Sequence, residues 1–113
     1  MQNFTPDVSA RVYRVDKFVV PDSAHQEFVN KVKLTHELLR KQPGFLQDFL
    51  LEQTGGPGEF NFVTFVEWES QAAVDNARTS VAAMFAESGF NPQELFAQLG
   101  IKADIANYKQ AGE

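Results

Sequence analysis

The chain has 113 residues, a formal net charge of −5 and 43% hydrophobic residues, with eleven phenylalanines and no cysteine. The acidic balance with scattered Lys and Arg argues against nucleic acid as a partner, and the lack of cysteine excludes disulfides and thiolate metal sites. No apolar stretch reaches the ~20 residues of a membrane span and the N-terminus lacks a signal-peptide pattern, so we expect a soluble cytoplasmic protein that contacts no membrane.

The first predicted element is a strand from Val8 to Val20, where β-branched and aromatic residues are interleaved with charged ones. Pro21 cannot continue a β-ladder and ends it. A helix capped by Asp22 or Ser23 is predicted to follow and to run to about Lys41. Its apolar stripe has helical spacing and contains Phe28, Val32, Thr35 and Leu39.

A hairpin of two long strands follows Pro43-Gly44, with a glycine-rich turn at residues 54–59. Both faces of this hairpin are apolar. In the second strand Phe60, Phe62, Val66 and Trp68 share one face, and Val63 and Phe65 share the other; in the first strand Phe45, Phe49 and Leu51 oppose Leu46 and Leu50. A sheet with one face in water should alternate apolar and polar residues. We therefore expect two covers, the second of them another copy of the chain, bound through Val63, Phe65 and Leu46 or Leu50.

Ser70 is a good N-cap for a second helix, which Gly89 ends. The apolar stripe of this helix is Val74, Ala77, Val81, Met84 and Phe85. Asn91-Pro92 starts a short third helix that Gly100 closes, and residues 101–108 alternate as a last strand. The order β-α-β-β-α-β predicts one α+β domain over residues 1–113, with its core at about 8–108. It is the ferredoxin-like fold, a four-stranded antiparallel sheet with helices on one face.

Three motifs carry a resemblance to a known family: Pro43-Gly44-Phe45 at the entry to the second strand, Trp68-Glu69-Ser70 at the exit of the third, and Phe18-Val19-Val20-Pro21 at the exit of the first. In this element order they resemble the antibiotic biosynthesis monooxygenase-like family of dimeric α+β barrels. The resemblance covers residues 8 to 108. It implies a homodimer formed through the sheet face, and a family whose members include cofactor-free oxygenases of aromatic polyketides, quinol oxygenases and haem-degrading enzymes.

The resemblance further implies a pocket between sheet and helices with Trp68 at its edge. The polyketide oxygenases have an asparagine four residues before this tryptophan, where this chain has Thr64. They have a tyrosine six residues after it, where this chain has Val74. Their arginine late in the second helix, and the second-helix histidine of the haem degraders, have no counterpart here. We expect Trp68, Phe28, Met84 and Phe85 to shape the pocket, and His36 and Thr64 to be its polar handles.

Both histidines lie in the first predicted helix. His25 and His36 are ~16 Å apart along the helix axis, which is too far for both to bind one metal ion. His36 could accept a proton from a ligand or orient it; the alternative is a partly buried histidine bonded to backbone. Thr64 could likewise bind a ligand or its own backbone, and Trp68 could be plain core. The acids Asp48, Glu52, Glu67 and Glu69 are expected at strand ends on the face opposite Trp68, or near the hairpin mouth, where they keep an edge soluble.

Two functions remain open from the sequence. The first is a cofactor-independent monooxygenase that acts on a hydrophobic aromatic or quinol-like compound, with no metal or organic cofactor. The second is a non-catalytic dimer of the same fold that binds a hydrophobic small molecule or acts in a stress response. The missing polar positions favour the second function, whereas the family resemblance favours the first.

Overall fold

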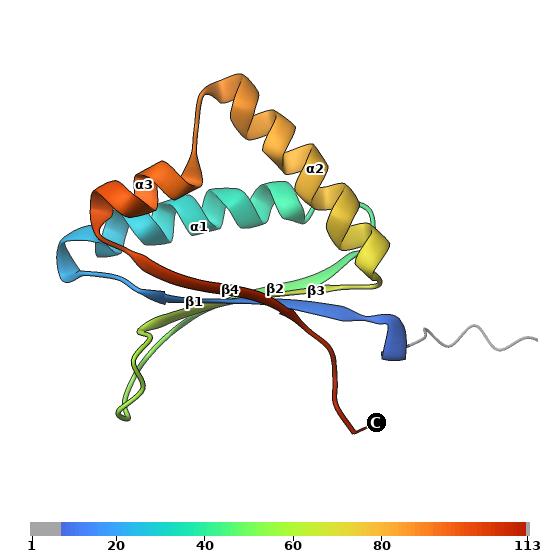
Figure 1. The fold of residues 1–113 in the computed structure, drawn as a ribbon, viewed down its shortest axis with the longest axis horizontal. Coiled ribbons are helices and arrows are strands. Elements are labelled where there is room, and N and C mark those ends of the chain that lie inside the picture. The colour runs from blue at the N-terminus through green and yellow to red at the C-terminus, as the bar shows by residue number, and fades with distance from the viewer. Residues whose placement is uncertain (1–7, 113) are drawn as a thin grey trace, which may run out of the picture.

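The computed structural model describes residues 8–112. Four strands form one antiparallel sheet in the order β2-β3-β1-β4, and three helices lie on one side of it (Figure 1). The strands are β1 (Val12–Val19), β2 (Phe45–Glu52), β3 (Phe62–Trp68) and β4 (Lys102–Tyr108). The helices are α1 (His25–Leu39), α2 (Gln71–Ser88) and α3 (Pro92–Leu99). The predicted ferredoxin-like α+β fold is confirmed.

The helix starts follow the predicted caps at two of three places. Ser70 accepts a hydrogen bond from the Ala73 amide at the start of α2, and Asn91 accepts two at the start of α3. The predicted side-chain cap of α1 is wrong. Residues Asp22–Ala24 form a 3₁₀ turn instead, and the helix begins at His25 with no capping side chain. The first strand is also shorter than predicted, because Val8–Ala10 is a 3₁₀ turn. No helix within residues 8–112 is long and apolar enough to cross a membrane.

A bulge in β2 decides which residues face the helices. Phe45 lies opposite Trp68 and Gln47 opposite Glu67, so Leu46 is an extra residue on β2. Because directly opposed residues share a face, Phe45, Asp48 and Leu50 face the helices. The predicted position of Asp48 on the face of the sheet away from Trp68 is therefore wrong. The predicted position of Leu50 in the apolar patch on that face is wrong for the same reason. The alternation of side chains between the two faces cannot continue unchanged through a bulge, because the extra residue shifts it by one position.

The face of the sheet away from the helices, which we call the open face, is rich in apolar and aromatic side chains. Phe65 at its centre lies 5.6 Å from Tyr13 and 5.8 Å from Phe49 between ring centroids. Phe49 and Leu51 are 49% and 52% exposed. A salt bridge of 2.9 Å between Arg11 and Glu67 borders this patch. No element among residues 8–112 covers this face.

The apolar core is divided into two clusters. The first lies under α1 and α3 and consists of Phe18, Val20, Ala24, Phe28, Val32, Phe62 and Ile101. The second lies at the start of α2 and consists of Val66, Trp68, Ala73, Val74 and Ala77. At this second end Gly44, with φ of +87°, leaves room for the Ala73 side chain, which a Cβ at position 44 would strike. The candidate site lies between these two clusters.

Candidate functional site

A row of polar residues crosses the helix side of the sheet between the two core clusters. On β3, Thr64 separates Phe62 of the first cluster from Val66 of the second. On β1, Asp16 lies opposite Thr64, and on β4, Asn107 lies opposite Arg14. On β2, Asp48 lies on the same face opposite Val66. We define the polar belt as Asp48 on β2, Thr64 on β3, Arg14 and Asp16 on β1, and Asn107 on β4. Polar groups at the centre of a helix–sheet interface cost free energy unless they are paired, so this belt is the first candidate for function.

Arg14 and Asp16 form an ion pair in the belt. The Arg14 Nε donates to Asp16 Oδ1 at 2.7 Å, and the two side chains are 31% and 18% exposed. Burial raises the pKa of the Asp16 carboxyl above its ordinary value of 3.8; Arg14 opposes this effect, and the nearby charge of Asp104 adds to it. A carboxylate with a raised pKa is a better proton acceptor near neutral pH than an ordinary one.

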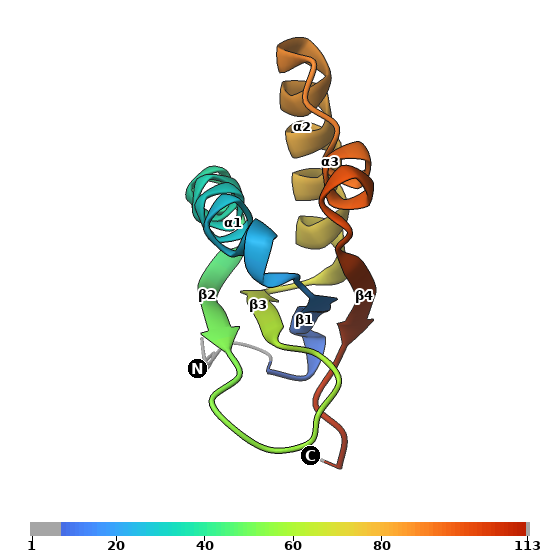
Figure 2. The same ribbon diagram turned by 90° about the vertical axis from the view of Figure 1, so that its left-hand side faces the viewer.

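The helix side of β4 next to this pair is exposed. Ile105 lies opposite Asp16 and Asn107 opposite Arg14, while Ala103 lies opposite Phe18. All three β4 residues are exposed, Ile105 to 51%. We call Ala103, Ile105 and Asn107 the β4 shelf. Figure 2 shows α1 above the β2 side of the sheet, with α2 and α3 on the β4 side. A flat apolar ligand on this shelf would have its edge at the Arg14–Asp16 pair.

The structure places three of the predicted site residues in the buried layer beside the pair. Thr64 is 5% exposed and lies directly opposite Asp16. Trp68 is 3% exposed, and its ring meets that of Phe45 edge-on at 5.8 Å in the second cluster. Phe28 is fully buried in the first cluster, 4.9 Å from Phe18 between ring centroids. Trp68 and Phe28 thus lie on opposite sides of the belt and do not meet.

The two predicted residues of α2 lie in its second half. Met84 is 37% exposed. The Phe85 ring packs edge-on against Phe90 at 5.1 Å, and Lys31 of α1 lies over the Phe90 ring at 4.9 Å. The buried residues of α2 all precede Met84, the last being Val81. Met84 and Phe85 are therefore outside the two core clusters, in the half of α2 that rises away from the sheet (Figure 1).

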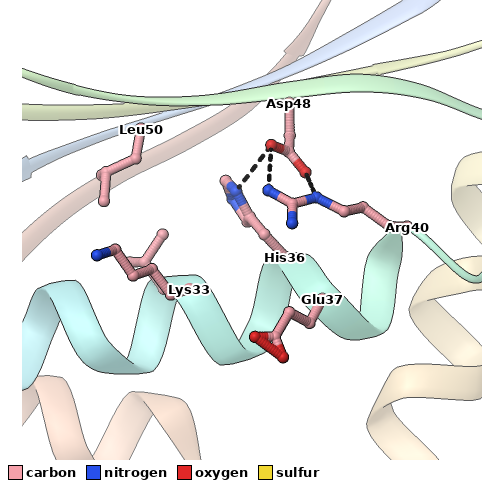
Figure 3. Close-up of a pocket in the computed structure, with 7 residues that line it drawn as sticks. Lys33, His36, Glu37, Arg40, Asp48 and Leu50 are labelled. Carbon is pink, nitrogen blue, oxygen red and sulfur yellow. Dashed lines mark hydrogen bonds and ion pairs between the residues drawn. The ribbon is translucent and has the colours of Figure 1, made fainter.

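His36 lies in the buried stripe of α1, four residues after Val32, and is 5% exposed. Its Nδ1 atom is 3.7 Å from Asp48 Oδ1, so it is turned toward the edge strand β2 (Figure 3). His25 pairs with Glu52 at 2.9 Å on the surface. The structure therefore brings Thr64 close to Asp16, and places His36 beside Asp48 at the β2 end of the polar belt.

The sequence reasoning missed Arg14 and Asp16. The available signal was their parity: both share a face with Val12 and Phe18, so they interrupt an otherwise apolar strand face. Charged side chains on a buried strand face need partners of opposite charge. Residues i and i+2 of one strand lie on the same face, so they can pair with each other.

The model of the antibiotic biosynthesis monooxygenase family matches residues 11–86 of this chain. The matched segment runs from the start of β1 into the second half of α2, so it contains both residues of the ion pair and Thr64 and Trp68. A comparison with curated protein sequences finds no match.

Several solved structures share the fold. A protein from Shewanella loihica, provisionally named a monooxygenase, has a TM-score of 0.72 at 18% identity, covering 93% of this chain and 98% of that one. SnoaB, a cofactor-independent oxygenase from Streptomyces nogalater, has a TM-score of 0.66 at 22% identity, covering 92% and 96%. A variant of MhuD with two manganese protoporphyrin IX molecules per active site has a TM-score of 0.67 at 20% identity, covering 90% and 96%. At these identities the likeness concerns the fold.

Proposed function

The chain belongs to the antibiotic biosynthesis monooxygenase family, and from this premise we propose that it oxidises a hydrophobic aromatic or quinol-like compound with dioxygen and without a bound cofactor. The observation that carries the proposal is the Arg14–Asp16 pair, a half-buried carboxylate and a cation that lie beside the exposed β4 shelf. SnoaB, which shares the fold, is a cofactor-independent oxygenase and supports this choice.

The chemistry needs one proton acceptor and one stabilising charge. Asp16 takes the proton of an aromatic hydroxyl, so that the substrate O–H bond breaks and a carboxyl O–H bond forms. The Arg14 guanidinium then stabilises the aromatic oxyanion. This electron-rich anion is the reductant and dioxygen is the oxidant. For a hydroquinone the balance is hydroquinone plus dioxygen giving hydroxyquinone plus water, so no further reductant is needed.

The remaining predicted residues would shape the site around this pair. Thr64, opposite Asp16, would offer its hydroxyl to the same end of the substrate. Phe28 and Trp68 would support the substrate from the two core clusters. His36 is the other proton acceptor that the sequence predicts. Variants of both residues distinguish which of the two accepts the substrate proton.

The test is dioxygen uptake by the metal-stripped protein with a panel of hydroquinones and polyphenols, measured with an oxygen electrode. We expect protein-dependent uptake for at least one compound, and a lower rate after Trp68→Phe with folding intact. The His36→Ala variant is measured beside Asp16→Asn to show which acceptor carries the rate. Absence of protein-dependent uptake across the panel would overturn the proposed reaction.

One observation favours the second function, a non-catalytic ligand-binding dimer. Val74, which stands where the resemblance implies a tyrosine, is 4% exposed and packs with Trp68 in the second cluster. No hydroxyl is available from that position. Under this function the same compounds would raise the melting temperature by mass action, with no dioxygen uptake.

We further propose that the assembly is a homodimer formed through the open face. The patch around Phe65, with Phe49, Leu51 and Tyr108 each about half exposed, is larger than soluble monomers usually leave in water. A second copy would cover it through the same residues on both chains, with a total buried area above ~1,000 Å².

Sedimentation tests the dimer. We expect the unaltered chain to be a dimer at micromolar concentration, and Phe65→Asp to give monomers or aggregates. The matched control is Leu34→Asp, which alters an apolar residue of α1 that is 56% exposed on the helix side. A well-folded monomer of the unaltered chain would contradict the proposal.

A further inference from the structure

A cavity of about 400 Å³ lies between α1 and the edge strand β2 (Figure 3). The cavity is lined by Val32, Lys33, His36, Glu37 and Arg40 of α1, and by Asp48 and Leu50 of β2. Its volume is within the usual range for small-molecule sites. Arg14, Asp16 and the β4 shelf, on which the proposed oxygenase site rests, do not line it.

The cavity exists because of the β2 bulge. Without the extra residue Leu46, the two-residue period would turn Gln47 and Phe49 toward α1 and leave Asp48 on the open face. With it, Asp48 and Leu50 face α1 and supply the polar end and an apolar wall. Bulges often re-aim side chains next to functional sites.

The polar end of the cavity is a chain of three side chains. Arg40 donates to Asp48 through Nε at 2.7 Å and through a terminal nitrogen at 2.9 Å. These bonds, above all, lower the pKa of Asp48 below 3.8, so this carboxylate is ionised and can only accept hydrogen bonds. Burial lowers the pKa of His36 below 6.5, which keeps its ring neutral at neutral pH.

This arrangement favours one tautomer of His36. Its Nδ1 atom faces the Asp48 carboxylate at 3.7 Å, so a proton on Nδ1 avoids the repulsion between a lone pair and the carboxylate. A neutral ring with its proton on Nδ1 has an unprotonated Nε2, which is a hydrogen-bond acceptor. The site therefore selects a ligand that donates a hydrogen bond.

The walls and charges narrow the ligand class further. Val32 and Leu50 are apolar, and Lys33 and Arg40 are balanced by Glu37 and Asp48. A site with balanced charges and a neutral histidine has no net attraction for an anion. Hydrogen-bond donation and an apolar body together describe a neutral hydroxylated aromatic compound.

We propose that the cavity between α1 and β2 is a second binding site, separate from the β4 shelf, for a neutral hydroxylated aromatic ligand whose hydroxyl donates to His36 Nε2. Asp48 orients the His36 ring, and Arg40 holds Asp48. Binding at this site requires no dioxygen, so its test is independent of the proposed reaction.

The probe is 4-fluorophenol, and the matched probe is 4-fluoroanisole, which has the same ring but no hydroxyl proton. Fluorine NMR titrations give the dissociation constant of each, and ¹⁵N-labelled histidine reports which ring moves. We expect 4-fluorophenol to bind about tenfold more tightly, as one net hydrogen bond provides. The His36 ring nitrogen signal should shift on titration, while that of His25, on the surface with Glu52, should not.

His36→Leu removes the acceptor and leaves Asp48 its two bonds from Arg40. This variant should bind both probes equally, whereas the control His25→Leu should keep the tenfold preference. Three results would overturn the proposal: equal binding of the two probes to the unaltered protein, no movement of the His36 signal, or a preference that survives His36→Leu. The His36 signal is read in the unaltered protein, so the proposal stays testable if the variant folds poorly.

Discussion

The helix side of the sheet holds two arginine–aspartate pairs whose electrostatics differ in direction. Asp16 on β1 and Asp48 on β2 both face the helices, and each accepts a hydrogen bond of 2.7 Å from an arginine Nε. Yet the pKa of Asp16 is raised, mainly by burial, and the pKa of Asp48 is lowered, mainly by its hydrogen bonds from Arg40. The same chemical partners thus leave one carboxylate with a raised pKa and the other with a lowered pKa.

The difference follows from strand position and from the number of bonds. Both carboxylates have little exposed surface, 18% for Asp16 and 8% for Asp48. But β1 is an inner strand with β3 and β4 on either side of it, whereas β2 is an edge strand, where Arg40 and His36 lie against Asp48. Asp48 also accepts two bonds from its arginine and Asp16 only one. The opposite directions of the two pKa shifts therefore follow from strand position and hydrogen bonding and not from exposed area.

The largest expected effect is on the rate of the proposed reaction, which should depend on Asp16. Asp16→Asn should lower the rate of dioxygen uptake by about a hundredfold or more, because an amide cannot accept the substrate proton. The control is Glu59→Gln, which alters an exposed carboxylate paired with Lys102 at 2.6 Å beside the hairpin turn. Steady-state rates on the same substrate, with circular dichroism to check folding, measure this. Equal rates for Asp16→Asn and the unaltered protein would remove Asp16 from the proposed mechanism.

The next effect separates the pairs by stability. Asp48→Asn should lower the free energy of unfolding by on the order of 1 kcal/mol at neutral pH, near the low end for hydrogen bonds to a charged group. Asp16→Asn should leave it unchanged or raise it, because burial already disfavours the Asp16 charge and Arg14, 31% exposed, can turn to water. Urea denaturation of both variants checks this. A larger loss for Asp16→Asn than for Asp48→Asn would reverse the assignment of the two pairs.

The sequence was sufficient for the element order, two of the three helix caps and the apolar nature of both sheet faces. It failed where one local feature changes the side-chain parity. Because Leu46 is an extra residue on β2, Asp48 lies buried against α1 and not at the solvent-exposed edge that the sequence predicts. The spacing predicts Thr35 in the buried stripe of α1, but His36 is the buried residue, because the sheet contacts the i, i+4 row of residues 28, 32 and 36. Bulges and helix rotation are set by packing with distant residues, which a single sequence does not display.

Acid titration should give opposite slopes for the two pairs. His36 has a folded pKa below 6.5 and Asp48 one below 3.8, so each contributes stability above its ordinary pKa that is lost as the pH falls. Asp16 has a raised pKa, so its contribution is gained as the pH falls through that value toward 3.8. Between pH about 7 and about 4, the Asp16→Asn variant should therefore lose more stability than the unaltered protein, and His36→Leu should lose less. Urea unfolding across this range measures both slopes, and parallel curves for all three proteins would contradict the assignment.

The smallest effect tests the third charge near Asp16. Asp104 lies on the open face of β4 opposite Lys17, and its charge is the weakest of the causes that act on the pKa of Asp16. Asp104→Asn should therefore lower the Asp16 pKa slightly. The Asp48 pKa should stay constant, because β2 and β4 are opposite edges of the sheet, ~14 Å apart at three strand spacings and beyond the ~8 Å screening length of physiological salt. Carbon NMR titration of the two carboxyl groups in one sample compares them directly. A fall at Asp16 that disappears in high salt would confirm a charge effect through the sheet, whereas equal shifts at both aspartates would mean that the substitution alters the fold rather than the local field.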